Sequence, residues 1–143
     1  MKNLAEETIL LPVPISRVYK LLSVIENYKN LLKAHTKDWK FDANTCSFIY
    51  DDSTFTKLKM YEATENEKVV MGTYGNNSID FDMEFLMFEV DKKRTNFKMV
   101  IKADLNPIMV SMFSSSMEEL KDDFLLDMKK ELGISAEIQK KQL

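Results

Sequence analysis

The end of the chain carries the clearest hydrophobic pattern. Between Asn106 and Gly133, apolar residues recur at steps of three and four, the spacing of one face of an α-helix. Asn106 can cap the free N–H groups, Pro107 fits the first helical position, and Gly133 can close the C-terminus in a left-handed conformation. The helix should be roughly 40 Å long, enough to cross a sheet. The stripe expected to face inward is Met109, Met112, Phe113, Ser116, Leu120, Phe124 and Met128.

From residue 37 to 105 the hydrophobic period changes to two, which is typical of half-buried strands. Residues 79–90 alternate most clearly, with Ile79 and Phe81 on one face and Asp80 and Asp82 on the other. Turns are predicted at residues 42–45, 51–53, 65–67, 75–78 and 91–94. Six consecutive antiparallel strands follow from these breaks.

The last two of these strands can be paired by their side chains. If Val90 pairs with Arg94, the apolar residues of both strands share one face, and the acidic residues of 79–90 lie near Lys98 and Lys102. A slip of one residue would destroy both matches. The predicted apolar pairs are Met87 with Phe97, Phe85 with Met99, and Met83 with Ile101. We therefore expect a three-residue loop with a bulge.

The beginning of the chain predicts one strand and two short helices. Residues 4–11 suit a strand, which the Pro12-Val13-Pro14 segment ends. Helices are expected over residues 15–22 and 26–34. The whole order is one strand, two helices, six strands and one long helix, which defines an α+β fold and not alternating β-α units. A length of 143 residues suits a single domain over 1–143.

Residues 14–31 carry a resemblance to a known family. The matching positions are Val18-Tyr19, Leu21-Leu22 and Glu26-Asn27-Tyr28, whereas Val24 and Ile25 stand where Asp-Pro is usual. Together with the element order, this segment resembles the START-like, or SRPBCC, superfamily, which includes Bet v 1-like proteins and polyketide cyclase/dehydrase-like bacterial proteins. The resemblance implies the helix-grip fold, a curved antiparallel seven-stranded sheet wrapped around a long C-terminal helix. It also implies a cavity between them for a small hydrophobic molecule such as a lipid, sterol or polyketide.

The chain is rich in Met (10) and Phe (9), and unbranched Met side chains adapt to varied apolar partners. For any single Met, plain core packing is the competing interpretation. Tyr61 and Tyr74 are candidates for hydroxyls that orient a ligand. The candidate ligand-binding residues are Met60, Met71, Thr73, Phe81, Met83, Phe85, Met99, Met109, Met112, Phe113 and Ser116.

The candidate chemistry is sparse. His35 is the only histidine, and its polar surroundings are typical of an exposed loop, so neither a Ser-His-Asp arrangement nor a metal site is predicted. Asp80, Asp82 and Glu84 lie on the polar face of their strand, where lysines of the next strand can partner them. We expect no catalytic residue, no metal and no cofactor.

Composition narrows the classes of partner. A formal net charge of −3 gives no general attraction to nucleic acid or anionic lipid. The single cysteine, Cys46, excludes an internal disulfide. The first seven residues are too polar for a signal peptide, and no apolar run approaches the length that spans a membrane. We expect a cytoplasmic protein without a nucleic-acid partner, and a protein partner stays open.

Three functions follow as hypotheses. The first is a carrier or sensor of a small hydrophobic molecule, favoured because no catalytic constellation is present. The second is a cyclase- or dehydrase-like enzyme acting in the same cavity, with Tyr61, Tyr74 and Glu62 as acids and bases. The third is a protein-interaction module whose cavity is filled by its own side chains.

Overall fold

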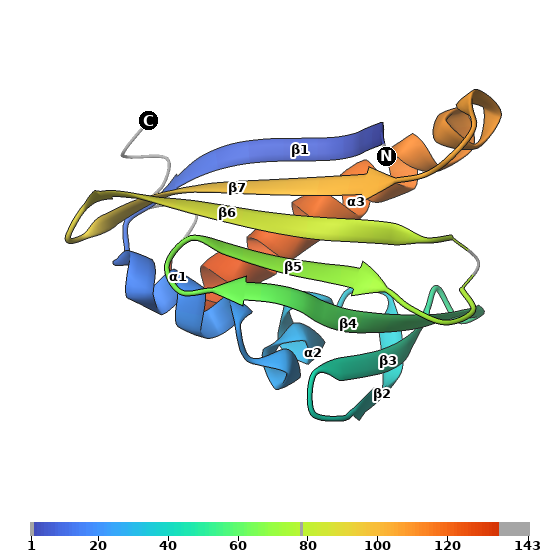
Figure 1. Ribbon diagram of the computed structural model, residues 1–143, viewed down its shortest axis with the longest axis horizontal. Helices are drawn as coiled ribbons and strands as arrows, with labels where there is room; N and C mark the ends of the chain where they lie inside the picture. The colour runs from blue at the N-terminus through green and yellow to red at the C-terminus, as the bar shows by residue number, and fades with distance from the viewer. Residues whose placement is uncertain (1, 78, 135–143) are drawn as a thin grey trace.

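The computed structural model, which describes residues 2–77 and 79–134, confirms the predicted order of elements (Figure 1). One strand and short helices precede six strands and a long helix. Ser78 of the predicted turn 75–78 lies outside the described residues. The elements are β1 (Lys2–Leu11), α1 (Ile15–Leu22), the 3₁₀-helix η1 (Ile25–Asn27), α2 (Tyr28–Leu31), β2 (Thr36–Phe41), β3 (Thr45–Tyr50), β4 (Thr54–Thr64), β5 (Lys68–Thr73), β6 (Phe81–Asp91), β7 (Arg94–Ala103) and α3 (Pro107–Glu131).

The strands form one curved antiparallel sheet with the order β1-β7-β6-β5-β4-β3-β2. The first strand pairs with the last, so β1 and β2 form the two edges. Figure 1 shows α3 crossing behind the sheet, with α1 and α2 beside its C-terminal part. The predicted α+β class and the helix-grip arrangement are therefore confirmed.

The β6–β7 hairpin has the predicted register over its length. Phe85 pairs with Met99 and Met83 with Ile101. The end of the hairpin differs, because Asp91 pairs with Arg94 and leaves a two-residue turn instead of a three-residue loop. The Asp91 carboxylate accepts hydrogen bonds from the Lys93 N–H and the Arg94 Nε, both at 2.8 Å. These bonds favour the tighter turn.

The second predicted helix is shorter than expected. In place of a helix over 26–34, the chain forms η1 and then the single turn of α2. Leu32, the residue after α2, is no longer helical, with φ −120° and ψ 26°, and His35 has a positive φ of 65°. The backbone therefore turns into β2 before a second helical turn can form.

The predicted ends of α3 are confirmed. The Asn106 side chain accepts a hydrogen bond from the Met109 N–H at 2.9 Å, and Gly133 has a φ of 75°. The predicted inward stripe is wrong at Met112, which is 66% exposed. Met112 lies about 100° around the helix from Phe113, and Phe113 is on the side that faces the sheet. The buried residues of α3 are Met117, Leu120, Lys121, Phe124, Leu125, Asp127 and Met128.

An aromatic cluster joins the sheet to the helices. The ring of Phe85 on β6 stacks on Phe124 of α3, with centroids 5.0 Å apart, and lies 6.0 Å from Phe97. Tyr28 of α2 packs against both Phe85 and Phe124, and its hydroxyl donates to the Leu22 carbonyl at 2.6 Å. The cluster therefore fixes the C-terminal half of α3 and the short helices against one part of the sheet.

A buried lysine ties the middle of α3 to the edge of the sheet. Lys121 is 3% exposed, and its Nζ lies 2.8 Å from Glu7 Oε1 on β1 and 3.1 Å from Asp122 Oδ1. It also donates to Glu118 one turn earlier. Burial alone would lower the pKa of Lys121, but these hydrogen bonds to carboxylates raise it above its usual range.

The aromatic cluster gives a test of the helix anchor. Replacing Phe124 with Ala removes a fully buried ring and should lower the free energy of unfolding by about 3–5 kcal/mol. Met112→Ala, on the exposed side of the same helix, should change it by less than about 0.5 kcal/mol. Urea unfolding followed by circular dichroism measures both. Equal losses in the two variants would contradict the packing described for α3.

Candidate functional site

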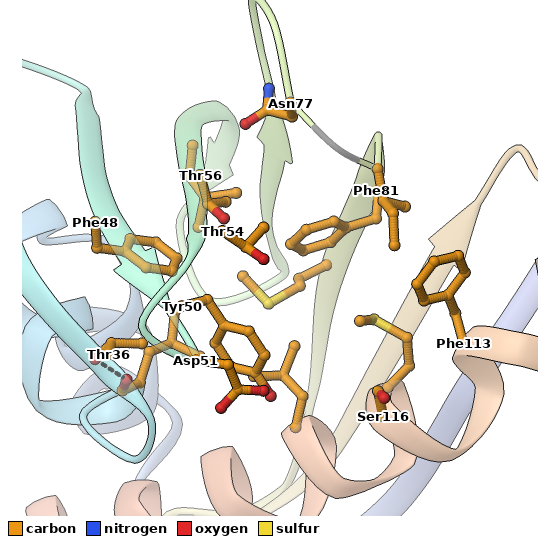
Figure 2. A pocket seen from close by; sticks show the side chains of 16 residues that line it. Thr36, Phe48, Tyr50, Asp51, Thr54, Thr56, Asn77, Phe81, Phe113 and Ser116 are labelled. Atoms are coloured by element: carbon orange, nitrogen blue, oxygen red, sulfur yellow. Dashed lines mark hydrogen bonds between the residues drawn. The ribbon is translucent and has the colours of Figure 1, made fainter.

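A cavity of about 240 Å³ lies between the sheet and the N-terminal half of α3 (Figure 2). Alternation along the strands supplies one wall, because every second residue of a strand points to the same side. The helix supplies the other wall from Phe113, Met117 and Leu120, which recur at steps of four and three. The other apolar side chains that line it come from the strands, from the end of α2 and from the loop before β6: Phe48, Leu58, Phe81, Met83, Leu32 and Ile79.

The polar groups of the cavity come mainly from the β3–β4 hairpin. Tyr50 ends β3, Asp51 starts the turn, and Thr54 and Thr56 alternate along β4. Figure 2 shows these four side chains across the cavity from Phe113. Within residues 2–77 and 79–134, the hydroxyls of Tyr50, Thr54 and Thr56 donate no hydrogen bond to another residue.

Two other polar residues of the wall already serve the structure. The Asn77 Oδ1 accepts from the Lys57 N–H at 2.8 Å, and its Nδ2 donates to the Tyr74 carbonyl at 2.7 Å. Thr36 donates to the Leu32 carbonyl and accepts from the Trp39 Nε1. Asn77 thus holds the loop after β5 against β4, at one side of the cavity.

Burial raises the pKa of Tyr50, and the nearby carboxylates of Asp51, Glu119 and Asp123 raise it further. The phenol therefore stays protonated and can donate a hydrogen bond at neutral pH. Asp51, Glu119 and Asp123 therefore place negative charge on this side of the cavity.

His35 brings a group of carboxylates together beside the cavity. Its Nδ1 lies 3.4 Å from Asp51 Oδ1, and its Nε2 lies 3.6 Å from Glu119 Oε1 and 3.8 Å from Asp123 Oδ2. Ligand atoms of His35, Glu119 and Asp123 come within 4.8 Å of one another, and an imidazole with carboxylates is a ligand set that divalent metals accept. These three residues are the ones in the described chain that could hold a metal ion.

Four of the predicted ligand-binding residues line the cavity: Phe81, Met83, Phe113 and Ser116. Phe113 and Ser116 come from α3, and Phe81 and Met83 from the start of β6. Met112 does not, because it lies on the exposed side of α3.

Other methionine and phenylalanine candidates pack in the core. Met71, Phe85 and Met99 are fully buried and do not line the cavity, and Phe85 belongs to the aromatic cluster. Met60 and Met109 are partly buried and pack against the core without lining the cavity. These five residues therefore pack in or against the core and do not line the cavity.

The predicted ligand-binding residue Thr73 and the two predicted orienting hydroxyls, those of Tyr61 and Tyr74, lie outside the cavity. Thr73 accepts a hydrogen bond from the Phe81 N–H at 3.0 Å and so serves the β5–β6 pairing. Tyr61 is 53% exposed and donates to the Thr73 carbonyl at 2.9 Å, since the alternation of β4 puts Thr56 and Leu58 on the inner face and Tyr61 on the outer one. The ring of Tyr74 lies beneath Lys57, with Nζ 4.6 Å from its centroid.

The comparisons with known proteins bear on the fold. No family model matches the sequence, and no curated protein matches it. Solved structures do match, at low sequence identity. A START superfamily protein from Mycobacterium smegmatis is 12% identical, with a TM-score of 0.64 over 90% of this chain and 97% of that one.

Two further matches carry other names. The Zhui aromatase/cyclase from Streptomyces sp. R1128 is 13% identical, with a TM-score of 0.66 over 89% of this chain and 91% of that one. The Aha1 dimer from Colwellia psychrerythraea is 17% identical, with a TM-score of 0.65 over 90% and 94%. The chain thus has the START-like helix-grip fold that the resemblance implied. None of its described helices is long and apolar enough to cross a membrane.

The effect of the negative charges beside the cavity can be tested through the pKa of Tyr50. Asp51→Asn removes one of the charges that raise the pKa of Tyr50, so that pKa should fall. The measurement is an absorbance titration of tyrosine ionisation, with Tyr50→Phe identifying the contribution of Tyr50. Asp52→Asn is the matched control, because Asp52 pairs with Lys37 and does not line the cavity. If the pKa of Tyr50 is the same in Asp51→Asn as in the unmodified protein, the described effect of the Asp51 charge on Tyr50 is contradicted.

Proposed function

We propose that this protein binds a small, mainly apolar molecule in the cavity under the N-terminal half of α3, as a carrier or sensor. The observation that supports this most is the cavity itself, lined by apolar side chains from the sheet and the helix. Buried apolar walls favour apolar ligands because binding removes apolar surface from water. The few polar groups on one side would fix the orientation of such a ligand.

The size of the cavity favours a compact ligand. A cavity of roughly 150 Å³ accepts benzene, and pockets for drug-sized ligands span about 300–1,000 Å³. At about 240 Å³, this cavity suits a molecule of one or two rings better than a long acyl chain or a sterol. This narrows the proposal within the hydrophobic ligands that the START-like fold suggests.

A cyclase-like enzyme is the second candidate. This candidate is supported by a phenol and a carboxylate, those of Tyr50 and Asp51, on the same side of the cavity. Such groups act as acids and bases in enzymes. A structurally similar protein also bears the name aromatase/cyclase. The residues first considered for this role, Tyr61, Tyr74 and Glu62, do not line the cavity.

The third candidate, an interaction module, assumed a cavity filled by the protein's own side chains. An open space of about 240 Å³ favours ligand binding over that hypothesis. The similarity to the Aha1 dimer is a similarity of fold at 17% identity and adds no partner to this proposal.

Filling the cavity tests the proposal. Both Ser115 and Ser116 are exposed, but only Ser116 lines the cavity, so Ser116→Phe should direct a ring into the space beside Phe113 and Ser115→Phe should not. Indole at 100 times its dissociation constant should raise the free energy of unfolding by about 2.7 kcal/mol in the unmodified protein and in Ser115→Phe. It should add nothing in Ser116→Phe. Urea unfolding with and without indole measures the effect.

The same experiment can contradict the proposal in two ways. Equal stabilisation of all three proteins would place indole outside the cavity. No stabilisation by indole, 1-naphthol or the neutral phenols of similar size, together with no small molecule in an organic extract of the purified protein, would count against a binding function.

A further inference from the structure

The cavity carries charge of one sign only. Among its lining residues, all within the described chain, there is no Lys, Arg or His, whereas Asp51 contributes a carboxylate. The partner of Asp51, His35 at 3.4 Å, does not line the cavity, and a second negative charge inside it would need a cation or several donors to offset its burial. The lining alone therefore disfavours an anionic ligand.

Groups behind this wall strengthen the negative field. Glu119 and Asp123 of α3 lie within 3.6 and 3.8 Å of the His35 ring, whose other nitrogen faces Asp51 at 3.4 Å. Three carboxylates thus surround one imidazole, and they outnumber its charge even when the ring is protonated. Tyr50 lines the cavity, and after burial, the main cause, the same three carboxylates raise its pKa.

The neighbouring lysines are turned to other partners. Lys57 follows the lining residue Thr56 along β4, but its Nζ lies over the ring of Tyr74 at 4.6 Å from the centroid. Lys37 Nζ lies 3.0 Å from Asp52 Oδ1 in the β3–β4 turn. Neither residue lines the cavity, so neither supplies a counter-charge to a ligand inside it.

The polar side of the cavity is suited to a ligand that donates hydrogen bonds. The carboxylate of Asp51 accepts only, and the hydroxyls of Thr54, Thr56 and Tyr50 accept as well as donate. A ligand amine presents several N–H donors and a positive charge to this side. A ligand carboxylate could use the three hydroxyls but would meet the Asp51 charge.

We infer that the cavity selects a small aromatic molecule bearing an amine, accepts the neutral alcohol less well, and discriminates against the carboxylate of the same shape. The inference rests on the proposed function and narrows it to a ligand class. The apolar ring would lie among Phe81, Met83 and Phe113, with the ammonium group toward Asp51.

Three molecules of nearly equal size test this: 2-phenylethylamine, 2-phenylethanol and phenylacetate, titrated calorimetrically at pH 7 and low salt. The amine should bind at least tenfold tighter than phenylacetate, with the alcohol between them. Raising the salt to about 1 M shortens the Debye length to about 3 Å and should reduce the difference, because Asp51 is partly exposed to solvent.

Two neighbouring aspartates provide a matched pair of variants. Asp51→Asn should reduce the advantage of the amine over phenylacetate about three- to tenfold, and Asp52→Asn should leave it unchanged. Both residues have positive φ, 49° and 65°, which Asn tolerates, so the backbone is disturbed equally in the two variants. Both lose one charge, but only Asp51 lines the cavity.

The outcomes separate the inference from the proposed function. Phenylacetate binding as tightly as the amine, or equal effects of Asp51→Asn and Asp52→Asn, would overturn the inference while binding in the cavity stands. Failure of all three molecules to bind while indole binds would do the same. Failure of indole as well would overturn the proposed function together with the inference.

Discussion

The uneven docking of α3 is the constraint on which the rest of the molecule depends. Its C-terminal half is held by the stack of Phe124 on Phe85, and its buried residues begin only at Met117. No residue from Pro107 to Ser116 is fully buried. Because a helix is rigid over this length, the contact that holds its C-terminal half also sets how far its N-terminal half stands from the sheet. The cavity is the space that this geometry leaves above the β3–β4 hairpin.

Elements with two independent patterns could be predicted from the sequence. The register of β6 and β7 was fixed by an apolar face and a charged face that demand the same pairing, and Glu84 does contact Lys102 at 2.8 Å. The ends of α3 were marked by Asn106 and Gly133, whose local roles need no tertiary contact. Such features depend on neighbours in sequence or on a single strand pairing.

The candidate site was less accessible from the sequence for physical reasons. Tyr61 could have been excluded from the sequence, because a period of two that puts Leu58 on the inner face of β4 puts Tyr61 on the outer one. Tyr50, Asp51 and Thr54 flank a turn, where polar residues are expected for local reasons alone. An alternating count from Phe48 through Tyr50 would have pointed to this wall. The meeting of His35 with Glu119 joins segments 84 residues apart, which only the folded chain reveals.

Lys121 separates the alignment of the helix from the shape of the cavity. Lys121 is 3% exposed, and Glu7 is its partner on the sheet, so a rotation of α3 about its axis, or a slide by one turn, would break this buried ion pair. The first turns of α3, up to Ser116, contribute no fully buried side chain. Substitutions there can change the volume or the polarity of the cavity while the position of the helix is kept. This end of the molecule is therefore a natural place to evolve, or to engineer, a new ligand preference.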